Sequence, residues 1–194
     1  MLPNPYPLTS VVAATRPDVV NAAKGRPADQ SVALWITDDE RWAELAPCLA
    51  LDAPARALAH RLLVAELVTL LVPVDDHPAW LAPATRHGKA LLFGARWLPL
   101  VPVLDGVGRL HVSSANRTGR APVASPAQAR RTFSADVHVF DLHDGRPAAD
   151  RRATTTLELH PDRTLTHVRD GAQDRAHGGP AAYLAHLANT YSLP

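Results

Sequence analysis

Short apolar runs of strand length recur along the chain and alternate with segments that carry helix signals. We predict strands at these apolar runs, which are residues 31–36, 68–73, 90–93, 98–104, 110–113, 137–140, 154–160 and 164–168. Capping residues, early prolines and apolar stripes predict helices at residues 19–24, 38–46, 52–66, 125–133 and 180–187. The mixed order predicts an α/β or α+β fold with a mixed sheet. Prolines exclude regular structure from residues 1–10.

Length and charge restrict the class of protein. We find no repeat or linker that would divide the 194 residues, so we expect a single domain over residues 1–194. The 20 basic and 19 acidic residues nearly cancel, which argues against binding nucleic acid through bulk positive charge. The sequence has no apolar stretch long enough to cross a membrane and no signal-peptide pattern. We therefore expect a soluble, cytoplasmic protein without a membrane partner.

Metal-ligating residues show no informative spacing. The single cysteine, Cys48, excludes an intrachain disulfide and a multi-cysteine metal cluster. The ten histidines are scattered, and neither H-E-x-x-H nor a comparable ligand pattern occurs. We therefore expect no metal bound by side chains.

Two hydroxyls, an amide and a glycine follow one predicted strand directly, in Ser113-Ser-Ala-Asn-Arg-Thr-Gly119. Small polar side chains at the carboxyl end of a buried strand, with backbone N–H groups nearby, can form a cradle for phosphate or carboxylate. If extended geometry continues, Ser114 and Asn116 project to one face. A turn that caps the following segment would use the same residues. Local chemistry leaves both interpretations open.

A lysine and an arginine stand two residues apart where the first predicted helix ends, in Lys24-Gly-Arg-Pro27. Lysine supplies a point charge and arginine a bidentate fork, so Lys24 and Arg26 can hold one polyanion together. Cations at a helix C-terminus also complement the helix dipole, which is the alternative for this pair. Lys24 is one of only two lysines, so it is more informative than any single arginine.

These two segments resemble motifs of the Sua5/YciO/YrdC family, whose members carry K-x-R-x and, far downstream, S-A-N-x-S-G. Further landmarks occur here in the family's order. They are Thr69 in a strand that ends at Pro73 (similar to T-L-x-L-P), Arg96-Trp-Leu-Pro99 (R-x-P), Ala153-Thr-Thr-Thr156 (P-S-T-V) and Arg169-Asp-Gly-Ala172 (R-x-G-A). The ordered set, rather than any one tetrapeptide, carries the resemblance.

The resemblance implies a twisted mixed sheet flanked by helices, with a concave basic cavity. The best-known members condense L-threonine, bicarbonate and ATP to threonylcarbamoyl-AMP for tRNA modification and release pyrophosphate. Related domains of carbamoyltransferases make or transfer carbamoyl-adenylates. Lys24 and Arg26 would be catalytic and face phosphates and carboxylates, and ATP would bind with Mg²⁺ held through its phosphates. The other implied substrate- or nucleotide-binding residues are Tyr6, Thr69, Arg96, Ser114, Asn116, Thr154 and Arg169.

The amino-terminal segment departs from the family pattern. Members begin with a strand followed by P-T-D/E-T-x-Y-G-L, whereas this chain offers only Pro3-Asn-Pro-Tyr-Pro-Leu-Thr-Ser10. Tyr6 and Leu8 match Y-G-L with Pro7 in place of glycine, which fixes φ and removes an N–H. We therefore expect a divergent, amino-terminally truncated relative for which L-threonine is a poor substrate.

Two hypotheses of function follow. The first is a nucleotide-dependent enzyme that forms or handles a carbamoyl-adenylate from ATP, with bicarbonate or a carbamoyl donor and an amino acid or other acceptor. The second is a non-catalytic protein of the same fold that binds a nucleotide or a structured RNA. Retention of Lys24, Arg26, Ser114 and Asn116 favours the enzyme. The altered amino-terminal segment favours the binding protein or a changed acceptor.

Overall fold

A computed structural model describes residues 1–75, 77–123, 125–142 and 146–194. The strands are β1 (Val11–Ala14), β2 (Ala33–Trp35), β3 (Thr69–Pro73), β4 (Thr85–Arg86), β5 (Lys89–Phe93), β6 (Leu110–Ser114), β7 (Thr156–Leu159) and β8 (Leu165–Arg169). The helices are α1 (Pro17–Lys24), α2 (Asp39–Leu45), α3 (Ala53–Val64), α4 (Val101–Leu104), α5 (Pro126–Thr132), α6 (Ala172–Ala176) and α7 (Pro180–Tyr191). Within the described residues, no helix is both long and apolar enough to cross a membrane.

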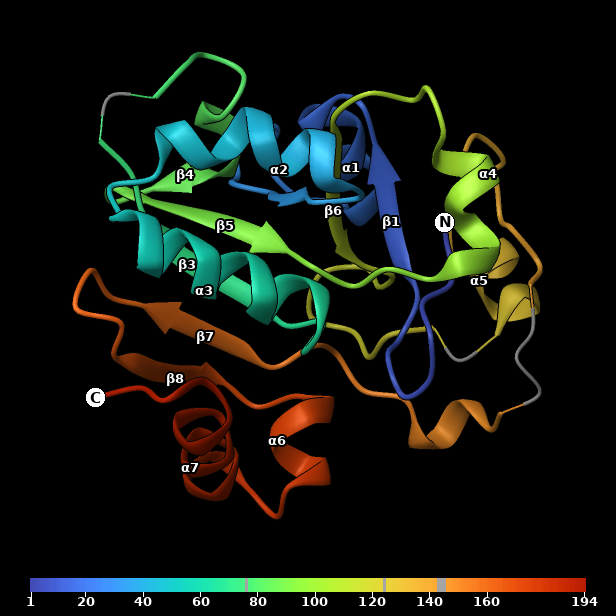
Figure 1. The fold of residues 1–194 in the computed structure, drawn as a ribbon. Helices are drawn as coiled ribbons and strands as arrows, with labels where there is room; N and C mark the ends of the chain where they lie inside the picture. The colour runs from blue at the N-terminus through green and yellow to red at the C-terminus, as the bar shows by residue number, and fades with distance from the viewer. Residues whose placement is uncertain (76, 124, 143–145) are drawn as a thin grey trace.

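The described strands form one mixed sheet in the order β1-β6-β2-β5-β3-β7-β8, with β4 paired to β5. β2 runs parallel to β5, and β3 runs parallel to β7, whereas the other neighbouring pairs are antiparallel. The sheet is curled and has helices packed against it (Figure 1). The predicted α/β fold with a mixed sheet is therefore confirmed.

Helices cover one face of the sheet. Leu34, Leu70 and Leu92 lie on this face and are buried together with residues of α2, α3 and α7. Figure 1 shows α3 lying along the sheet and α7 beside β8, which it contacts. The side chain of Asp52 caps α3 by accepting a hydrogen bond from Ala55 N at 2.8 Å. Apolar side chains fill this face of the sheet, and the candidate functional site lies on the opposite face.

The opposite face combines aromatic and polar side chains. Neighbouring residues of a strand point to opposite sides, so Trp35 and Phe93 face away from the leucine layer. Their rings meet edge to face with centroids 5.7 Å apart, and Trp35 Nε1 donates to Ala95 O at 2.7 Å. Thr69 pairs with Phe93 in the β3–β5 register and therefore lies on the same face. The packed aromatic pair thus lies on the same face of the sheet as the hydroxyl of Thr69.

Two predicted strands are wrong. Residues 98–104 form a 3-10 turn followed by α4, because Pro99 and Pro102 lack an N–H for a sheet and have a φ that suits a helical turn. Residues 137–140 are irregular, and in this segment Phe140 N donates to Met1 O at 3.1 Å. Conversely, β1 and α6 were not predicted, since four or five residues give too short a pattern.

A buried carboxylate joins the start of α6 to the residue that precedes β7. Asp174 is 3% exposed and accepts hydrogen bonds from Thr155 Oγ1 and from Gly171 N. A Cβ atom at Gly171 would lie 2.1 Å from Thr155 N, so only glycine permits this approach. Burial opposes ionisation of Asp174, but the hydrogen bonds and nearby His167 more than offset it and lower the pKa of the carboxyl.

This network predicts an acid-sensitive contribution to stability. Because the pKa of Asp174 is lower in the folded than in the unfolded chain, its contribution is present above about pH 3.9 and is lost as pH falls through the folded pKa. We expect Asp174→Asn to lower the free energy of unfolding at pH 7 by about 1.5–3 kcal/mol, with a smaller loss at low pH. Urea unfolding across pH 3–7 measures this difference, and a pH-independent loss would contradict it.

Candidate functional site

A cavity of about 280 Å³ opens on the concave face of the sheet. Its lining includes five of the residues singled out from the sequence, which are Arg26, Thr69, Ser114, Thr154 and Arg169. These residues come from the loop after α1, from β3, from β6 and from the segment around β7 and β8. None of the described lining residues is acidic, and two of them are arginines. The cavity therefore suits an anion or a polar molecule with anionic oxygens.

Two arginines supply the positive charge. Arg26 follows Gly25, whose φ of 66° ends α1 in a left-handed turn. The Nε of Arg26 donates to Asn21 Oδ1, while its Nη2 is buried without a hydrogen-bond partner among the described residues. Arg169 ends β8, and its Nη2 donates to Thr154 O at 3.0 Å. Burial lowers the pKa of both guanidinium groups, so an anion would relieve the cost of burying them.

Two threonine hydroxyls form a pair inside the cavity. Thr69 Oγ1 and Thr154 Oγ1 are 2.5 Å apart, and each residue is 5% exposed. One hydroxyl must donate to the other, which leaves the second hydroxyl free to donate to a ligand. Parallel pairing of β3 with β7 brings together these two positions, which are far apart in the chain. Thr154 and Thr69 thus provide a neutral, adaptable hydrogen-bonding surface.

Lys24 is not among the residues that line the cavity. Its Nζ donates to Ser114 O, to Asn116 O at 2.8 Å and to Asn116 Oδ1 at 2.9 Å. The three donors of an ammonium group are thereby all used within the protein. Burial, and after it the charge of Arg26, lowers the pKa of Lys24 to about 8. The structure thus connects the two sequence motifs through Lys24.

The segment 113–119 combines both interpretations that the sequence left open. Ser113 and Ser114 line the cavity, as the cradle interpretation predicts. Asn116 makes the turn, since its Oδ1 accepts from Ser114 Oγ at 2.6 Å and its Nδ2 donates to Arg120 O at 2.7 Å. The strand geometry ends at Ser114, so Asn116 does not continue the same face.

Tyr6 and Arg96, like Lys24 and Asn116, do not line this cavity. Tyr6 is 42% exposed, with the guanidinium groups of Arg146 and Arg151 over its ring at 5.6 and 5.8 Å. Arg96 donates from Nε to Ile36 O and from Nη1 to Asp39 Oδ1, both at 3.2 Å. The structure therefore separates Tyr6 and Arg96 from the other implied residues.

The sequence did not single out Asn4 as a residue of the site. This residue is 1% exposed and lines the cavity next to residues of β1 and β6. Its backbone is held by Arg151, whose Nη1 donates to Asn4 O at 3.1 Å and to Leu8 O at 2.8 Å. Asn4 lies in the altered amino-terminal segment. The prolines of this segment give no periodicity from which the direction of the Asn4 side chain could be predicted.

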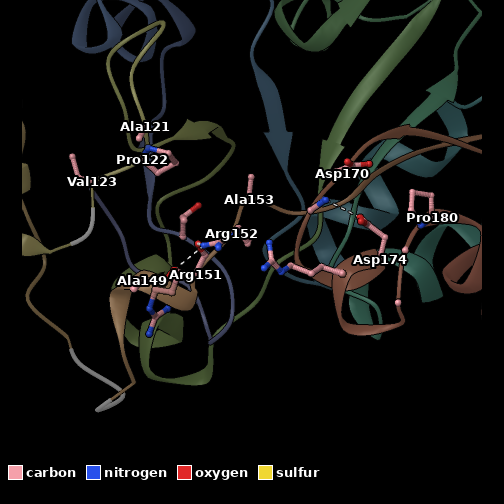
Figure 2. Close-up of a pocket in the computed structure, with 15 residues that line it drawn as sticks. Ala121, Pro122, Val123, Ala149, Arg151, Arg152, Ala153, Asp170, Asp174 and Pro180 are labelled. Carbon is pink, nitrogen blue, oxygen red and sulfur yellow. Dashed lines mark hydrogen bonds between the residues drawn. The ribbon is translucent and has the colours of Figure 1, made fainter.

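A second, larger cavity of about 770 Å³ adjoins the first and shares Thr9 and Ala153 with it. Figure 2 shows Arg152 and Asp170 among its lining residues, with Asp174 at the wall formed by α6. Arg151, Arg152 and Arg175 contribute positive charge to this lining. The two cavities together provide a small polar compartment beside a wider, arginine-bearing one.

One group of side chains could hold a metal ion. A ligand atom from each of His167, Asp170 and Asp174 lies within 4.8 Å of the others. However, Asp174 Oδ1 already accepts from Thr155 and Gly171, and His167 Nε2 lies 3.5 Å from the same oxygen. Hydrogen bonds within the chain therefore already engage this carboxylate oxygen.

The geometry of the chain is similar to that of proteins of known structure. No family model matches the chain. It shares a fold with P. abyssi Sua5 complexed with L-threonine, at a TM-score of 0.62 and 18% identity, covering 88% of this chain and 49% of that one. It also matches full-length HypF in a phosphate- and nucleotide-bound form, at a TM-score of 0.50 and 14% identity over 82% of this chain and 25% of that one.

These matches define the class as an α/β protein with the Sua5 fold. In sequence, the chain is 33% identical over 96 residues to threonylcarbamoyl-AMP synthase of Thiobacillus denitrificans, a match that covers 44% of this chain and 50% of the relative. The chain thus spans about half the length of the curated relative that it matches. The predicted resemblance to the Sua5/YrdC family is confirmed by this likeness in fold and in part of the sequence.

The hydrogen bonds of Asn116 predict a structural role for its side chain. Asn116→Ala removes the acceptor for Lys24 and Ser114 and the donor to Arg120 O, so we expect the free energy of unfolding to fall by about 1–3 kcal/mol. Asn189→Ala, at an exposed position of α7, is the control and should change it by about 0.5 kcal/mol or less. Urea unfolding tests this, and an Asn116→Ala variant as stable as the wild type would contradict it.

Proposed function

We propose that the protein binds ATP and forms or handles a carbamoyl-adenylate. The observation that carries this proposal is the convergence of Arg26, Arg169 and the Thr69–Thr154 pair in one cavity that has no acidic lining residue among those described. This smaller cavity can neutralise phosphate and carboxylate oxygens but, among its described lining residues, offers no carboxylate for acid–base chemistry. The fold of Sua5 and the partial identity to a threonylcarbamoyl-AMP synthase support the same reaction class.

The proposed reaction needs positioning and charge neutralisation. An amine of the acceptor and bicarbonate first condense to a carbamate with loss of water. A carbamate oxygen then attacks the α-phosphorus of ATP, the bond from this phosphorus to the oxygen that bridges to the β-phosphate breaks, and pyrophosphate leaves with the electron pair. Arg26 and Arg169 would stabilise the charge that develops on the phosphoryl oxygens. Ser114 and the Thr69–Thr154 pair would orient the acyl portion through hydrogen bonds. Mg²⁺ would be held by the phosphates.

The two adjoining cavities suit the two portions of such an adenylate. The smaller cavity has the size and polarity for an acyl group and one phosphate, whereas the wider cavity offers room for a nucleoside. Thr9 and Ala153, which line both cavities, would lie near the junction between the two portions. Arg152 and Arg175 would then face the remaining phosphates.

Lys24 would contribute indirectly under this proposal. Its ammonium group donates to Ser114 O and to Asn116. It therefore fixes the edge of the cavity where Ser114 lies and adds a positive charge near it. A direct bond to phosphate would require Lys24 to give up one of these acceptors. Arg26, whose Nη2 lacks a partner among the described residues, is the better candidate for the first contact with the anion.

A non-catalytic role is the second candidate. Two observations favour it: all three Lys24 donors are occupied, and the amino-terminal segment departs from the family pattern. A protein of this kind would bind a nucleotide, or the nucleotide portion of a structured RNA, in the same cavities without releasing pyrophosphate.

Removal of Arg26 should weaken nucleotide binding without unfolding the protein. The lost charge-assisted contact corresponds to about a 10- to 150-fold loss of ATP affinity in Arg26→Ala, measured by calorimetry. Arg131→Ala, at an exposed position of α5, is the matched control and should leave affinity unchanged. Equal affinities of the wild type and Arg26→Ala would exclude the proposed phosphate contact.

Pyrophosphate release separates the enzyme from the binding protein. With ATP and bicarbonate, we expect release that depends on an acceptor other than L-threonine, because the segment carrying P-T-D/E-T-x-Y-G-L in the family is altered here. The assay is run with each of the 20 common amino acids and with a carbamoyl donor. ATP binding without release under any condition would support the non-catalytic role. Turnover of L-threonine comparable to that of an intact family member would show that the segment is dispensable.

A further inference from the structure

Asn4 presents a buried hydrogen-bond acceptor to the cavity. Its Nδ2 donates to Thr9 O at 2.8 Å, and because a carbonyl oxygen can only accept, this bond fixes which end of the amide is which. The Oδ1 is therefore the other end of the amide, and it is buried with no hydrogen-bond partner among the described residues. A buried acceptor without a partner is costly, so this oxygen calls for a donor from a bound molecule.

The segment that carries Asn4 is held rigidly. Arg151 Nη1 bonds the carbonyls of Asn4 and Leu8, and Leu2 and Val11 exchange backbone hydrogen bonds at 2.8 and 2.9 Å. Pro3 and Pro5 on either side restrict φ. Asn4 Oδ1 is therefore preorganised and cannot easily turn to another donor within the chain.

The same cavity presents an unpaired cationic donor. Arg26 Nη2 is buried without a partner among the described residues, while its Nε is anchored to Asn21. A ligand that satisfies both groups must carry an N–H donor for Asn4 and an anionic oxygen for Arg26. Val11, Leu91 and Phe93 supply apolar walls, and the volume of about 280 Å³ limits this portion of the ligand to a small molecule.

The charge of the lining decides what kind of N–H is favoured. A cationic ammonium group would enter a cavity that holds two arginines and, among its described lining residues, no carboxylate to pair with it. A neutral amide or carbamoyl N–H pays a smaller desolvation cost and meets no repulsion from the arginines. The lining therefore favours a neutral donor.

We infer that Asn4 is a specificity-determining residue that selects a ligand with a neutral carbamoyl or amide N–H beside an anionic oxygen. This inference rests on the proposed function and adds to it the residue that recognises the N–H of the carbamoyl group. Asn4 binds the N–H, Arg26 binds the anionic oxygen, and the Thr69–Thr154 pair is available to the carbonyl oxygen. Asn4 takes no part in bond breaking.

Two acyl phosphates of nearly equal shape test the inference on the wild-type protein. Carbamoyl phosphate carries an NH₂ group where acetyl phosphate carries a methyl group. We expect carbamoyl phosphate to bind about 5- to 150-fold more tightly, because acetyl phosphate leaves Asn4 Oδ1 unpaired. Equal affinities in calorimetry on fresh solutions would overturn the inference. This comparison needs no variant, so it does not depend on how well a mutant folds.

A variant locates the selectivity at Asn4. In Asn4→Ala, carbamoyl phosphate should fall to the affinity of acetyl phosphate, while acetyl phosphate binds as in the wild type. Asn189→Ala is the matched control and should keep the full preference. Thermal unfolding checks that Asn4→Ala is folded, and a preference that persists in the folded variant would overturn the assignment to Asn4.

A second probe pair tests the charge of the donor. N-carbamoylglycine should bind more tightly than glycine, which carries an ammonium group, and the reverse order would overturn the preference for a neutral donor.

An ATP titration distinguishes failure of this inference from failure of the proposed function. If ATP binds and the two acyl phosphates bind equally, only the selectivity of Asn4 is wrong. If neither ATP nor either acyl phosphate binds, the proposed function fails and the inference fails with it.

Discussion

One buried ammonium group joins the two segments on which the site depends. Lys24, 4% exposed at the end of α1, donates to Ser114 O and to two oxygens of Asn116, while its own carbonyl accepts from Thr118 N at 3.2 Å. Residues some 90 positions apart in the chain are thereby fixed to each other. Because the carboxyl end of β6 is held in this way, Ser114 faces the cavity and the following turn is directed away from it. The loop after α1, which carries Arg26, is placed by the same contact.

This contact has an electrostatic consequence for the cavity. Lys24, Arg26 and Arg169 are all at least partly buried, and burial lowers the pKa of each. Protein acceptors satisfy Lys24, and Thr154 O satisfies part of Arg169, but Arg26 Nη2 has no partner among the described residues. Within the cavity, the folded protein therefore bears the cost of a buried guanidinium N–H that has no partner among the described residues. An anionic ligand would remove this cost, which is the condition for a preorganised electrostatic site.

The sequence predicted most of the regular structure, because apolar periodicity and capping residues are local signals. It failed at residues 98–104, where Pro99 and Pro102 override an apolar run, and at β1, where four residues beside a proline-rich segment give too little pattern. Motif order identified Arg26, Thr69, Ser114, Thr154 and Arg169, which the sheet brings to one cavity. Sequence order could not show that Lys24, Tyr6 and Arg96 do not line this cavity or that Asn4 does. Those placements depend on strand pairing and on single hydrogen bonds between distant segments.

The apolar packing is divided between the two faces of the sheet. The leucine layer under α2, α3 and α7 is a separate apolar cluster from the one around Trp35 and Phe93 beside the cavity. Substitutions around the cavity therefore leave the main core intact, since stability arises chiefly from buried apolar packing. This separation is consistent with a structural match over 88% of the chain beside a sequence match of 96 residues. The amino-terminal segment belongs to the cavity side of the sheet: Asn4 lines the cavity, while Leu2 and Leu8 pack in the cluster around Trp35 and Phe93 and not in the leucine layer.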